Sequence, residues 1–438
     1  MLKSRLLFPR HKRQHILYQT YFFNSSRRSI TSTPSQIRPR PTLSTVSANH
    51  VNTKKIKYID DLSTADYYFE KGLRKVKPYY FDYLAHANDR WIGRPCLQVM
   101  NTEFRDRNDA YFREAIDTGM ITINGKRVDY DTLFKKGDTL GHRVHRHEPP
   151  VTADPIQVIY RDDEWMMINK PGGIQAHPSG RYRHNSVVHI LRKQYDLSSL
   201  YPINRLDRQT SGLMMIGLNS QKAQHIQQQM QNGNIEKEYL CRVQGEFPKD
   251  QVTCDIPIKP MGFKFSFQYA DFHNGKPSKT LFERVSFNGR TSVVRCRPIT
   301  GRTHQIRVHL RYLGYPIVND PVYGPHTAWS TLLNRFDPAD PSGSVVTQVL
   351  DKMMEMTTFD TLDTSDGQAR CHECRSLLSS DPLPGQSLGI WLHSSRYSGN
   401  GWSFSSTTGK DIHGVELKLP SWAMDDFDKD IDVLPTFV

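Results

Sequence analysis

The sequence predicts an α+β protein with a mixed or antiparallel sheet, on three observations. Two short apolar segments, Pro155–Tyr160 and Trp165–Asn169, flank a polar stretch, as the strands of a hairpin do. Further strand-like runs follow at Tyr239–Val243 and Val293–Arg297. Between and after them, residues 219–233 and 303–313 carry apolar side chains at helical spacing, and each of these segments ends near a glycine. Neighbouring strands with intervening helices indicate an α+β domain, which we place at residues 150–330.

A smaller module precedes this domain at residues 78–148. The stretch Tyr111–Ile116 predicts a short helix that ends by Gly119, and Asn124-Gly125 predicts a hairpin turn within Met120–Val128. A further turn at Lys136-Gly137-Asp138 leads into another strand. This order of elements is similar to the S4 RNA-binding module, and the alternative is a β-rich extension without that role.

The N-terminal region has the composition of a targeting signal. Residues 1–59 contain 12 Lys and Arg and no acidic residue, so that removing those 12 from the 58 basic residues leaves 46 against 45 acidic ones. The net charge of +13 is therefore almost wholly N-terminal. Residues 1–45 predict a mitochondrial transit peptide, with import to the matrix, while the alternative is a basic RNA-binding arm. Residues 46–77 predict a linker.

The C-terminal region lacks clear periodicity at first and then becomes strand-like. We expect residues 331–385 to be an insertion, partly flexible, and residues 386–438 to supply strands that pack on the catalytic domain. The six scattered cysteines form no disulfide framework. Cys371 and Cys374 form a Cys-x-x-Cys pair, half of a zinc site that His393 or His413 could complete. One such pair is weak evidence, so we predict no metal ligand from the sequence and leave zinc open.

The most informative segment is Arg205-Leu206-Asp207-Arg208-Gln209-Thr210-Ser211-Gly212-Leu213. Thr, Ser and Gly favour a turn, and the apolar residues after them predict a buried strand. Asp207 is thus expected on a loop held by a strand, with arginines beside it. Such a carboxylate stays ionised and can be directed at a substrate, whereas the alternative is a surface Asp–Arg ion pair.

Several motifs in order resemble the RluA-type pseudouridine synthases. The central one matches His-Arg-Leu-Asp-x-x-Thr-Ser-Gly of that family, with Asn204 where bacterial members carry His. The other motifs stand at Lys170–Gly180, Glu236–Leu240, Thr300–Leu310 and Asn319–Gly324. With Asn204, the sequence is similar to the eukaryotic, fungal-like branch that includes the tRNA pseudouridine 32 synthases. The Asn204 difference leaves Asp207 intact but argues against transferring a bacterial substrate to this chain.

The resemblance implies the roles of the site residues. Asp207 is implied as the nucleophile or the electrostatic partner of the sugar and uracil, Arg307 as the partner of Asp207, and Tyr239 as the residue against the uracil. We expect Arg307 to hold Asp207 through a bidentate pair. Substrate and RNA contacts are implied for a further set: Arg205, which would replace the flipped base, Ile306, Arg181, Arg183, His184 and Arg302. The isomerisation has no redox step, so no cofactor is expected.

The predicted function is RNA pseudouridine synthase, an isomerase that converts uridine to pseudouridine in tRNA, at position 32 of mitochondrial tRNAs. The alternatives are a mitochondrial rRNA pseudouridine synthase and a non-catalytic RNA-binding or ribosome-assembly factor. We expect a monomer that binds tRNA. No apolar run approaches the roughly 18 residues that a membrane span requires, so no membrane partner is expected.

Overall fold

The computed structural model describes residues 65–104, 107–261, 267–339, 344–355, 369–382, 387–424 and 427. The predicted transit peptide and most of the predicted linker lie outside the described residues. Among the described helices, none is both long enough and apolar enough to cross a membrane.

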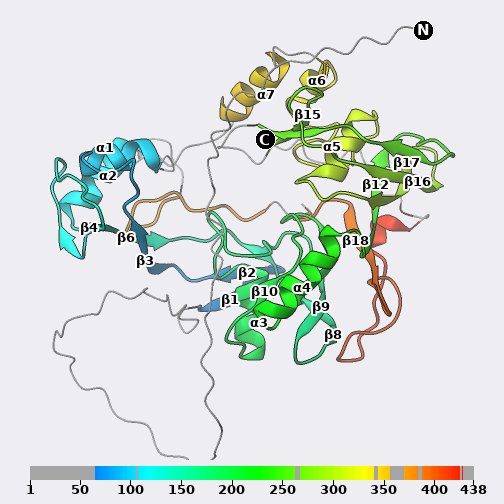
Figure 1. Ribbon diagram of the computed structural model, residues 1–438, viewed down its shortest axis with the longest axis horizontal. Helices are drawn as coiled ribbons and strands as arrows, with labels where there is room; N and C mark the ends of the chain where they lie inside the picture. The colour runs from blue at the N-terminus through cyan, green and yellow to red at the C-terminus, as the bar shows by residue number, and fades with distance from the viewer. Residues whose placement is uncertain are drawn as a thin grey trace, which may run out of the picture. The chain divides into compact units, whose positions relative to one another are not determined.

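A ten-stranded sheet confirms the predicted α+β class (Figure 1). Its main path runs β13-β16-β17-β12-β18-β11-β9-β8, with β10 paired to β11 and β19 paired to β18. The predicted hairpin is present, since β8 and β9 pair antiparallel. The bounds of the ten strands are β8 (Gln157–Arg161), β9 (Trp165–Lys170), β10 (Tyr201–Pro202), β11 (Ser211–Gly217), β12 (Glu236–Gln244), β13 (Val252–Cys254), β16 (Thr280–Phe287), β17 (Thr291–Pro298), β18 (Leu392–Gly399) and β19 (Trp402–Ser405).

Strand β18 is a central strand of this sheet, between β12 and β11. It pairs parallel with β11, Ser211 opposite His393, and antiparallel with β12. The C-terminal strands were expected to pack on the catalytic domain, and β18 instead joins its two halves (Figure 1). Strand β18 also forms an antiparallel hairpin with β19, within the residues expected to supply strands. Pairing across more than 150 residues leaves no local signal in the sequence.

Gly212 allows this close pairing. It has a φ of 106°, and a Cβ at this position would lie 2.3 Å from the carbonyl oxygen of Ser394 on β18. Any larger residue would therefore push β18 away from β11. The glycine of the Thr-Ser-Gly motif thus fixes the strand that follows the Asp207 loop.

Helices α3 (Val187–Tyr195), α4 (Ser220–Gln231) and α5 (Gln305–Tyr312) belong to the same domain. Helix α4 begins where predicted, because the Asn219 side chain accepts a hydrogen bond from the Lys222 amide at 2.7 Å. Helix α5 is mostly buried, and its Ile306 and Leu310 lie in the same apolar cluster as the β12 residues Cys241 and Val243. This packing fixes the position of the first turn of α5 relative to the sheet.

The N-terminal module has its own sheet and core. Strands β3 (Tyr79–His86), β6 (Thr139–Arg146), β4 (Ile121–Ile123) and β5 (Lys126–Arg127) pair in that order. Helices α1 (Cys96–Glu103) and α2 (Asp109–Asp117) complete the module, and α1 was not predicted. Its buried core includes Trp91, Phe112 and Phe134. Asn124 and Gly125 both have positive φ, as the predicted two-residue hairpin turn requires.

The remaining elements connect these parts. A small sheet of β1 (Tyr67–Glu70), β2 (Leu73–Val76) and β7 (Val151–Thr152) lies within the predicted linker and the start of the domain, and β14 (Ile258–Pro260) pairs with β15 (Gln268–Ala270). The predicted insertion is more ordered than expected, since α7 (Ser344–Glu355) follows the short α6 (Ser330–Leu333). Val346 and Val349 of α7 are buried, so this helix contributes to an apolar cluster. A 3-10 turn, Ser421–Ala423, ends the described elements.

We expect the stability of the fold to decrease as the pH falls from about 6.5 to 4. Burial lowers the pKa of His309 and of His393 from 6.5 to about 4. Between these values the unfolded chain binds the protons and the folded chain does not, so acid favours unfolding by on the order of 3 kcal/mol per histidine. In urea titrations across this range, His393→Gln should lose less stability than the wild type. The exposed His225→Gln is the control and should follow the wild type; equal slopes for all three proteins would contradict the expectation.

Candidate active site

Asp207 lies on the loop between β10 and β11. Its backbone carbonyl accepts a hydrogen bond from the Thr210 amide at 3.1 Å, and Leu206 beside it is buried in the core. The side chain of Asp207 is one-quarter exposed and borders a cavity of about 560 Å³. Residues from the Asp207 loop, α4, β12, α5 and β18 line this cavity, among them Arg205, Asp207, Met230, Lys237, Tyr239, Arg302, His304, Ile306, Arg307 and Tyr397.

Arg307 on α5 links two carboxylates. Its Nη1 donates to Asp207 Oδ2 at 3.3 Å, while Nε and Nη2 donate to Asp320 Oδ2 and Oδ1 at 2.6 and 2.8 Å. The bidentate pair expected with Asp207 is therefore made with Asp320, and Asp207 receives a single, longer bond. Asp320 is held in turn by the backbone amides of Val322 and Tyr323. Asp320 thus holds the Arg307 guanidinium in place, and one remaining N–H of Arg307 donates to Asp207.

Both members of the buried pair stay charged. Burial opposes the charge on Arg307, but Asp320 and then Asp207 outweigh it and raise the pKa of Arg307 above its usual value. Burial also opposes ionisation of Asp320, and Arg307 with the two amides nevertheless keeps the pKa of Asp320 below its usual value. A permanently charged guanidinium therefore lies beside the Asp207 carboxylate.

His304 is a second neighbour of Asp207. Its Nε2 lies 3.6 Å from Asp207 Oδ2, and its Nδ1 lies 2.9 Å from the Tyr323 hydroxyl. Burial, and then the charge of Arg307, lower the pKa of His304 to about 4, so the ring is neutral at pH 7. The Tyr323 oxygen already accepts the Gln268 amide, so its hydrogen can go to Nδ1, leaving the ring proton on Nε2 towards Asp207. His304 is thus a neutral donor rather than a base.

His304, whose ring lies beside Asp207, has a strained backbone conformation. The residue precedes α5 with φ 56° and ψ 18°, a left-handed conformation that costs a non-glycine residue roughly 1 kcal/mol. This conformation places the imidazole between Tyr323 and Asp207. Backbone strain of this kind concentrates at functional sites.

Tyr239 on β12 is oriented by a chain of hydrogen bonds. Its hydroxyl lies 3.1 Å from that of Tyr397 on β18, and Asn204 Nδ2 donates to the Tyr397 oxygen at 3.0 Å. The Asn204 Oδ1 accepts the Met215 amide at 2.8 Å, which fixes the orientation of the side-chain amide. Because Tyr397 accepts from Asn204, its own hydrogen can go to Tyr239. Burial raises the pKa of Tyr239, so its hydroxyl is protonated at neutral pH.

Replacing Tyr397 with Phe should lower kcat by roughly tenfold, because one hydrogen bond that orients Tyr239 is lost. The measurement is single-turnover pseudouridine formation on a tRNA substrate. KM should change little, since Tyr397 would act through Tyr239. Tyr160→Phe, which removes a hydroxyl bonded to Asp162 outside the cavity, is the control. An unchanged kcat in Tyr397→Phe would contradict the positioning role.

Lys170 lies behind the Asp207 loop. It is fully buried, and its Nζ donates to the backbone carbonyls of Pro171, Ile174 and Arg208 at 2.9–3.1 Å. Burial lowers the pKa of Lys170 to about 7, with Asp207 acting in the opposite direction. Lys170 is the first residue of the motif Lys170–Gly180. Through its hydrogen bond to the Arg208 carbonyl it supports the loop that carries Asp207.

The predicted RNA contacts divide into two groups. Arg205, Ile306 and Arg302 line the cavity together with the three predicted catalytic residues. Arg181 and Arg183 do not. Arg181 donates to Ser379 Oγ at 2.8 Å, and the Arg183 guanidinium lies 4.4 Å from the centre of the Phe81 ring.

The expectation of an RNA contact for His184 is wrong in this structure. The side chain is completely buried and lies against the Tyr79 ring, with centroids 4.4 Å apart. Glu148 accepts the backbone amides of Arg183, His184 and Asn185, which turns this loop inwards. His184 therefore belongs to the contact between the module and the domain.

Four residues of the site were not identified from the sequence: His304, Asp320, Lys170 and Tyr397. The first three lie inside motifs named in the sequence analysis, and their position in those motifs could have identified them as site residues. Tyr397 had none, because it reaches the site only through the pairing of β18 with β12. The two histidines considered as zinc partners of the Cys-x-x-Cys pair have other neighbours. His393 lies between the hydroxyls of Ser211 and Ser406, and His413 lies near the Tyr195 hydroxyl.

This geometry, a loop aspartate facing an arginine in a sheet-lined cavity, coincides with a family match. A family model described as RNA pseudouridylate synthase matches residues 164–312. The chain is 38% identical to Pseudouridylate synthase RPUSD2 of Homo sapiens, over 85% of this chain and 77% of that protein. The chain therefore belongs to the RNA pseudouridylate synthase family and is an isomerase that converts uridine to pseudouridine.

Two yeast relatives are similar over most of their length. The chain is 37% identical to "tRNA pseudouridine(32) synthase, mitochondrial" of Saccharomyces cerevisiae, over 87% of this chain and 83% of that protein. It is 30% identical to "tRNA pseudouridine(31) synthase" of the same organism, over 83% of this chain and 98% of that protein.

Proposed function

We propose that this chain converts uridine 32 in the anticodon loop of mitochondrial tRNAs to pseudouridine, and that Asp207 is its nucleophile. The observation that carries the proposal is the Asp207 carboxylate at the edge of the cavity, with Oδ2 bound by Arg307 and Tyr239 on the same wall. The similarity to the yeast enzyme named for position 32 supports the choice of substrate.

The reaction breaks the C1′–N1 bond of uridine and forms a C1′–C5 bond. Both contacts of Asp207 within the described residues are made by Oδ2, so Oδ1 is the oxygen available to the sugar. Asp207 would hold the ribose at C1′ while the uracil turns, and the carboxylate leaves when C5 bonds to C1′. The Tyr239 hydroxyl, oriented by Tyr397, would relay the C5 proton, and N1 ends protonated.

The walls of the cavity suit a flipped base. Ile306 is buried beneath the cavity and gives one face of the uracil an apolar contact, and the exposed Arg205 can fill the gap left in the RNA. Flipping costs a few kcal/mol and less in an unstacked loop, which favours an anticodon loop as substrate. Arg302 would contact a phosphate next to the target.

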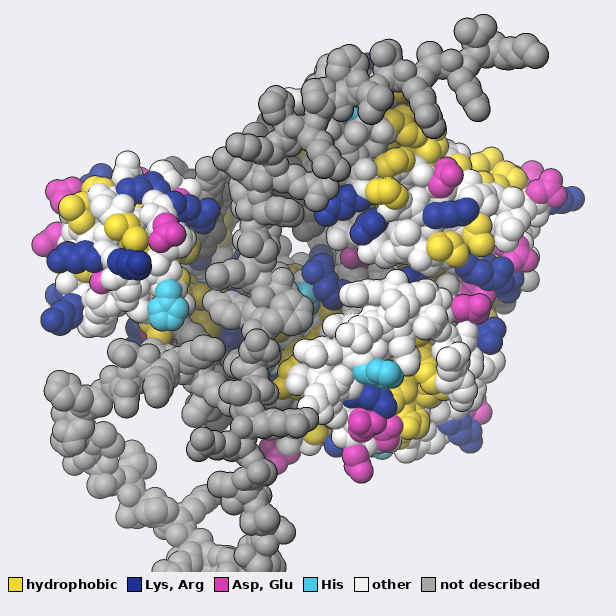
Figure 2. All heavy atoms as spheres, in the orientation of Figure 1, with side chains coloured by type: hydrophobic (Ala, Val, Ile, Leu, Met, Phe, Trp, Pro, Cys, Tyr) yellow, Lys and Arg dark blue, Asp and Glu magenta, His cyan; other side chains and the backbone are white. Residues whose placement is uncertain are grey.

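The N-terminal module would extend the RNA contact as an S4-like domain. Its order of two helices followed by a hairpin supports this assignment. Four exposed basic residues lie on its hairpin and next turn: Lys126, Arg127, Lys135 and Lys136. Figure 2 shows basic side chains among acidic ones on the module. Arg183, whose guanidinium lies over Phe81 of this module, would bind a phosphate beside it, and Arg181 would bind another next to Ser379. That the protein acts as a monomer stays a prediction.

Matrix localisation would follow from residues 1–45. Their basic, acid-free composition supports this, as does the word mitochondrial in the name of the yeast relative. A fluorescent reporter fused to residues 1–45 should enter mitochondria. Replacing the arginines of this segment with glutamine should leave the reporter in the cytosol, and a cytosolic signal from the unaltered fusion would contradict the targeting proposal.

The test is pseudouridine mapping of mitochondrial and cytosolic tRNA and rRNA in cells that lack the protein. Loss of the signal at tRNA position 32, restored by the wild type and not by Asp207→Ala, is the expected result. Loss of the signal at position 31 would mean that the modified nucleotide is uridine 31, the position in the name of the second yeast relative. Loss confined to rRNA would establish the alternative substrate, and no loss at any site would favour the RNA-binding factor.

A further inference from the structure

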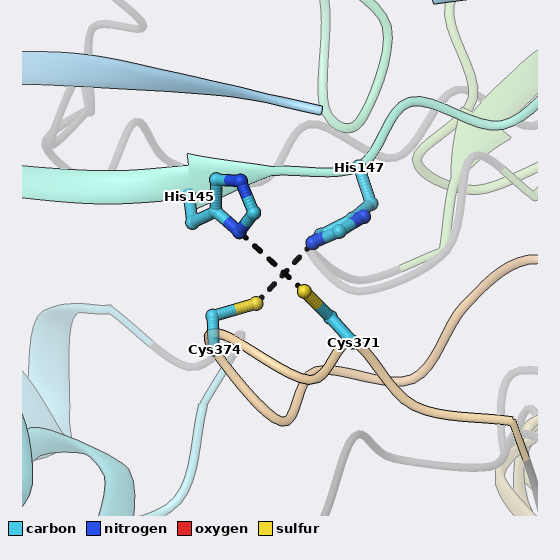
Figure 3. Close-up of side chains that lie close together, drawn as sticks. All are labelled: His145, His147, Cys371 and Cys374. Atoms are coloured by element: carbon cyan, nitrogen blue, oxygen red, sulfur yellow. Dashed lines mark hydrogen bonds between the residues drawn. The ribbon is translucent and has the colours of Figure 1, made fainter. Parts of the chain in front are cut away.

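Two pairs of side chains, far apart from each other in sequence, converge outside the active site. They are His145 at the end of β6, His147 just after it, and Cys371 and Cys374 of the Cys-x-x-Cys pair. One ligand atom from each lies within 4.8 Å of all the others. Figure 3 shows the two imidazoles and two thiols pointing towards a common centre.

We propose that these residues form a structural zinc site that fastens residues 369–382 to the N-terminal module. Zinc binds thiolates and imidazoles at about 2.3 and 2.0–2.1 Å, so tetrahedral coordination separates sulfur from nitrogen by about 3.6 Å. The observed separations are 3.2 Å from His147 Nε2 to Cys374 Sγ and 3.6 Å from His145 Nδ1 to Cys371 Sγ. Two Cys and two His satisfy a closed, four-ligand structural site.

The surroundings orient the ligands as an outer shell does. The far nitrogen of His145, Nε2, lies 3.4 Å from the Glu373 carboxylate, so Nδ1 is the nitrogen available to the metal. The Tyr80 hydroxyl donates to the other oxygen of Glu373, and the Tyr80 ring lies 4.7 Å from the His145 ring. The Glu373 amide is directed at Cys371 Sγ at 3.4 Å. These contacts hold the imidazole and thiol in place for coordination.

The segment that carries the cysteines, residues 369–382, contributes little to the apolar core. Within residues 369–382 only Ser376 is buried, so no apolar side chain of this segment enters a core. Exposed contacts also reach this segment, among them the Lys75–Asp381 ion pair and the Arg181–Ser379 hydrogen bond. A short segment without a core needs a crosslink to keep one conformation, and a bound metal supplies it.

The crosslink joins parts of the chain 226 and 227 residues apart. Closing so long a loop restricts the unfolded chain strongly, so the metal should stabilise the folded protein. The site is separate from the catalytic cavity, none of whose lining residues is a ligand. Its role is therefore the placement of the module and of residues 369–382, with no part in the isomerisation.

The experiment is metal analysis of the full chain, purified without a histidine tag from zinc-supplemented cells. We expect one zinc ion per chain, lost in Cys371→Ser/Cys374→Ser and in His145→Ala/His147→Ala. His372→Ala lies between the two cysteines without joining the cluster, and Cys254→Ala removes a buried thiol elsewhere; both controls should keep the metal. Zinc retained at full ratio in both double variants would overturn the proposal.

Cobalt substitution keeps the test decisive if the double variants misfold. The wild type with Co²⁺ should show tetrahedral d–d bands and a thiolate charge-transfer band, and Cys374→His should keep the ion with a weaker charge-transfer band. Chelation should accelerate tryptic cleavage after the exposed Arg375. A wild type that binds neither ion, or that carries a Cys371–Cys374 disulfide, would refute the site.

Discussion

Asp207→Asn should reduce pseudouridine formation by at least about 10⁴-fold, because the amide cannot act as the carboxylate nucleophile at C1′. The fold should survive the change, since Arg307 keeps both of its bonds to Asp320 when its contact to Asp207 is weakened. Single-turnover assays on an anticodon stem-loop, together with thermal unfolding, measure the two effects separately.

The control for Asp207→Asn is Asp162→Asn, which removes a carboxylate on the β8–β9 turn outside the cavity. Its activity should equal that of the wild type. RNA binding by Asp207→Asn should also persist, because Arg205 and Arg302 are unchanged. Turnover by Asp207→Asn at more than a hundredth of the wild-type rate would remove Asp207 from the nucleophile role.

Asp320→Asn should destabilise the protein by about 3–5 kcal/mol, because it leaves the buried Arg307 guanidinium without its main counter-charge. The side chains of both residues are almost wholly buried, 3% and 0% exposed, so solvent cannot replace the lost interaction. Activity should fall as well, since Arg307 would be free to turn towards Asp207. Urea unfolding gives the free energy of unfolding directly.

An exposed ion pair provides the comparison. Lys222 and Glu164 are 2.6 Å apart, with side chains 27% and 55% exposed. Glu164→Gln should cost roughly 0–1 kcal/mol, as exposed pairs do. If Asp320→Asn cost no more than this, the buried pair would contribute nothing to the stability of the site.

Local patterns predicted much of this structure. The Asn219 cap, the Asn124-Gly125 turn and the β8–β9 hairpin depend on neighbouring residues, and all three are present. The motifs also brought Asp207, Tyr239 and Arg307 into one cavity as expected. These features were predictable because each is specified within a few residues or by a recognised motif.

The rest depends on contacts between distant segments. The partner of Arg307 could not be chosen between Asp207 and Asp320 without the position of α5 against both loops. The burial of His184 depends on Glu148, 36 residues earlier. The cysteine pair lies beside His145 and His147, at and just after the end of β6, and not beside His393 or His413, which are nearer in sequence. Distance along the chain did not predict which histidines lie close to the cysteines in space.

The central place of β18 has a consequence for how the enzyme is made. Until Gly399 has been made, β12 lacks its β18 neighbour from Glu236 to Cys241, β11 lacks it at Ser211 and Gly212, and Tyr397 is not available to orient Tyr239. A nascent or truncated chain therefore exposes two open strand edges, which are sites of aggregation. The edge of β12 that β18 covers must therefore stay shielded until the residues of β18 have been made.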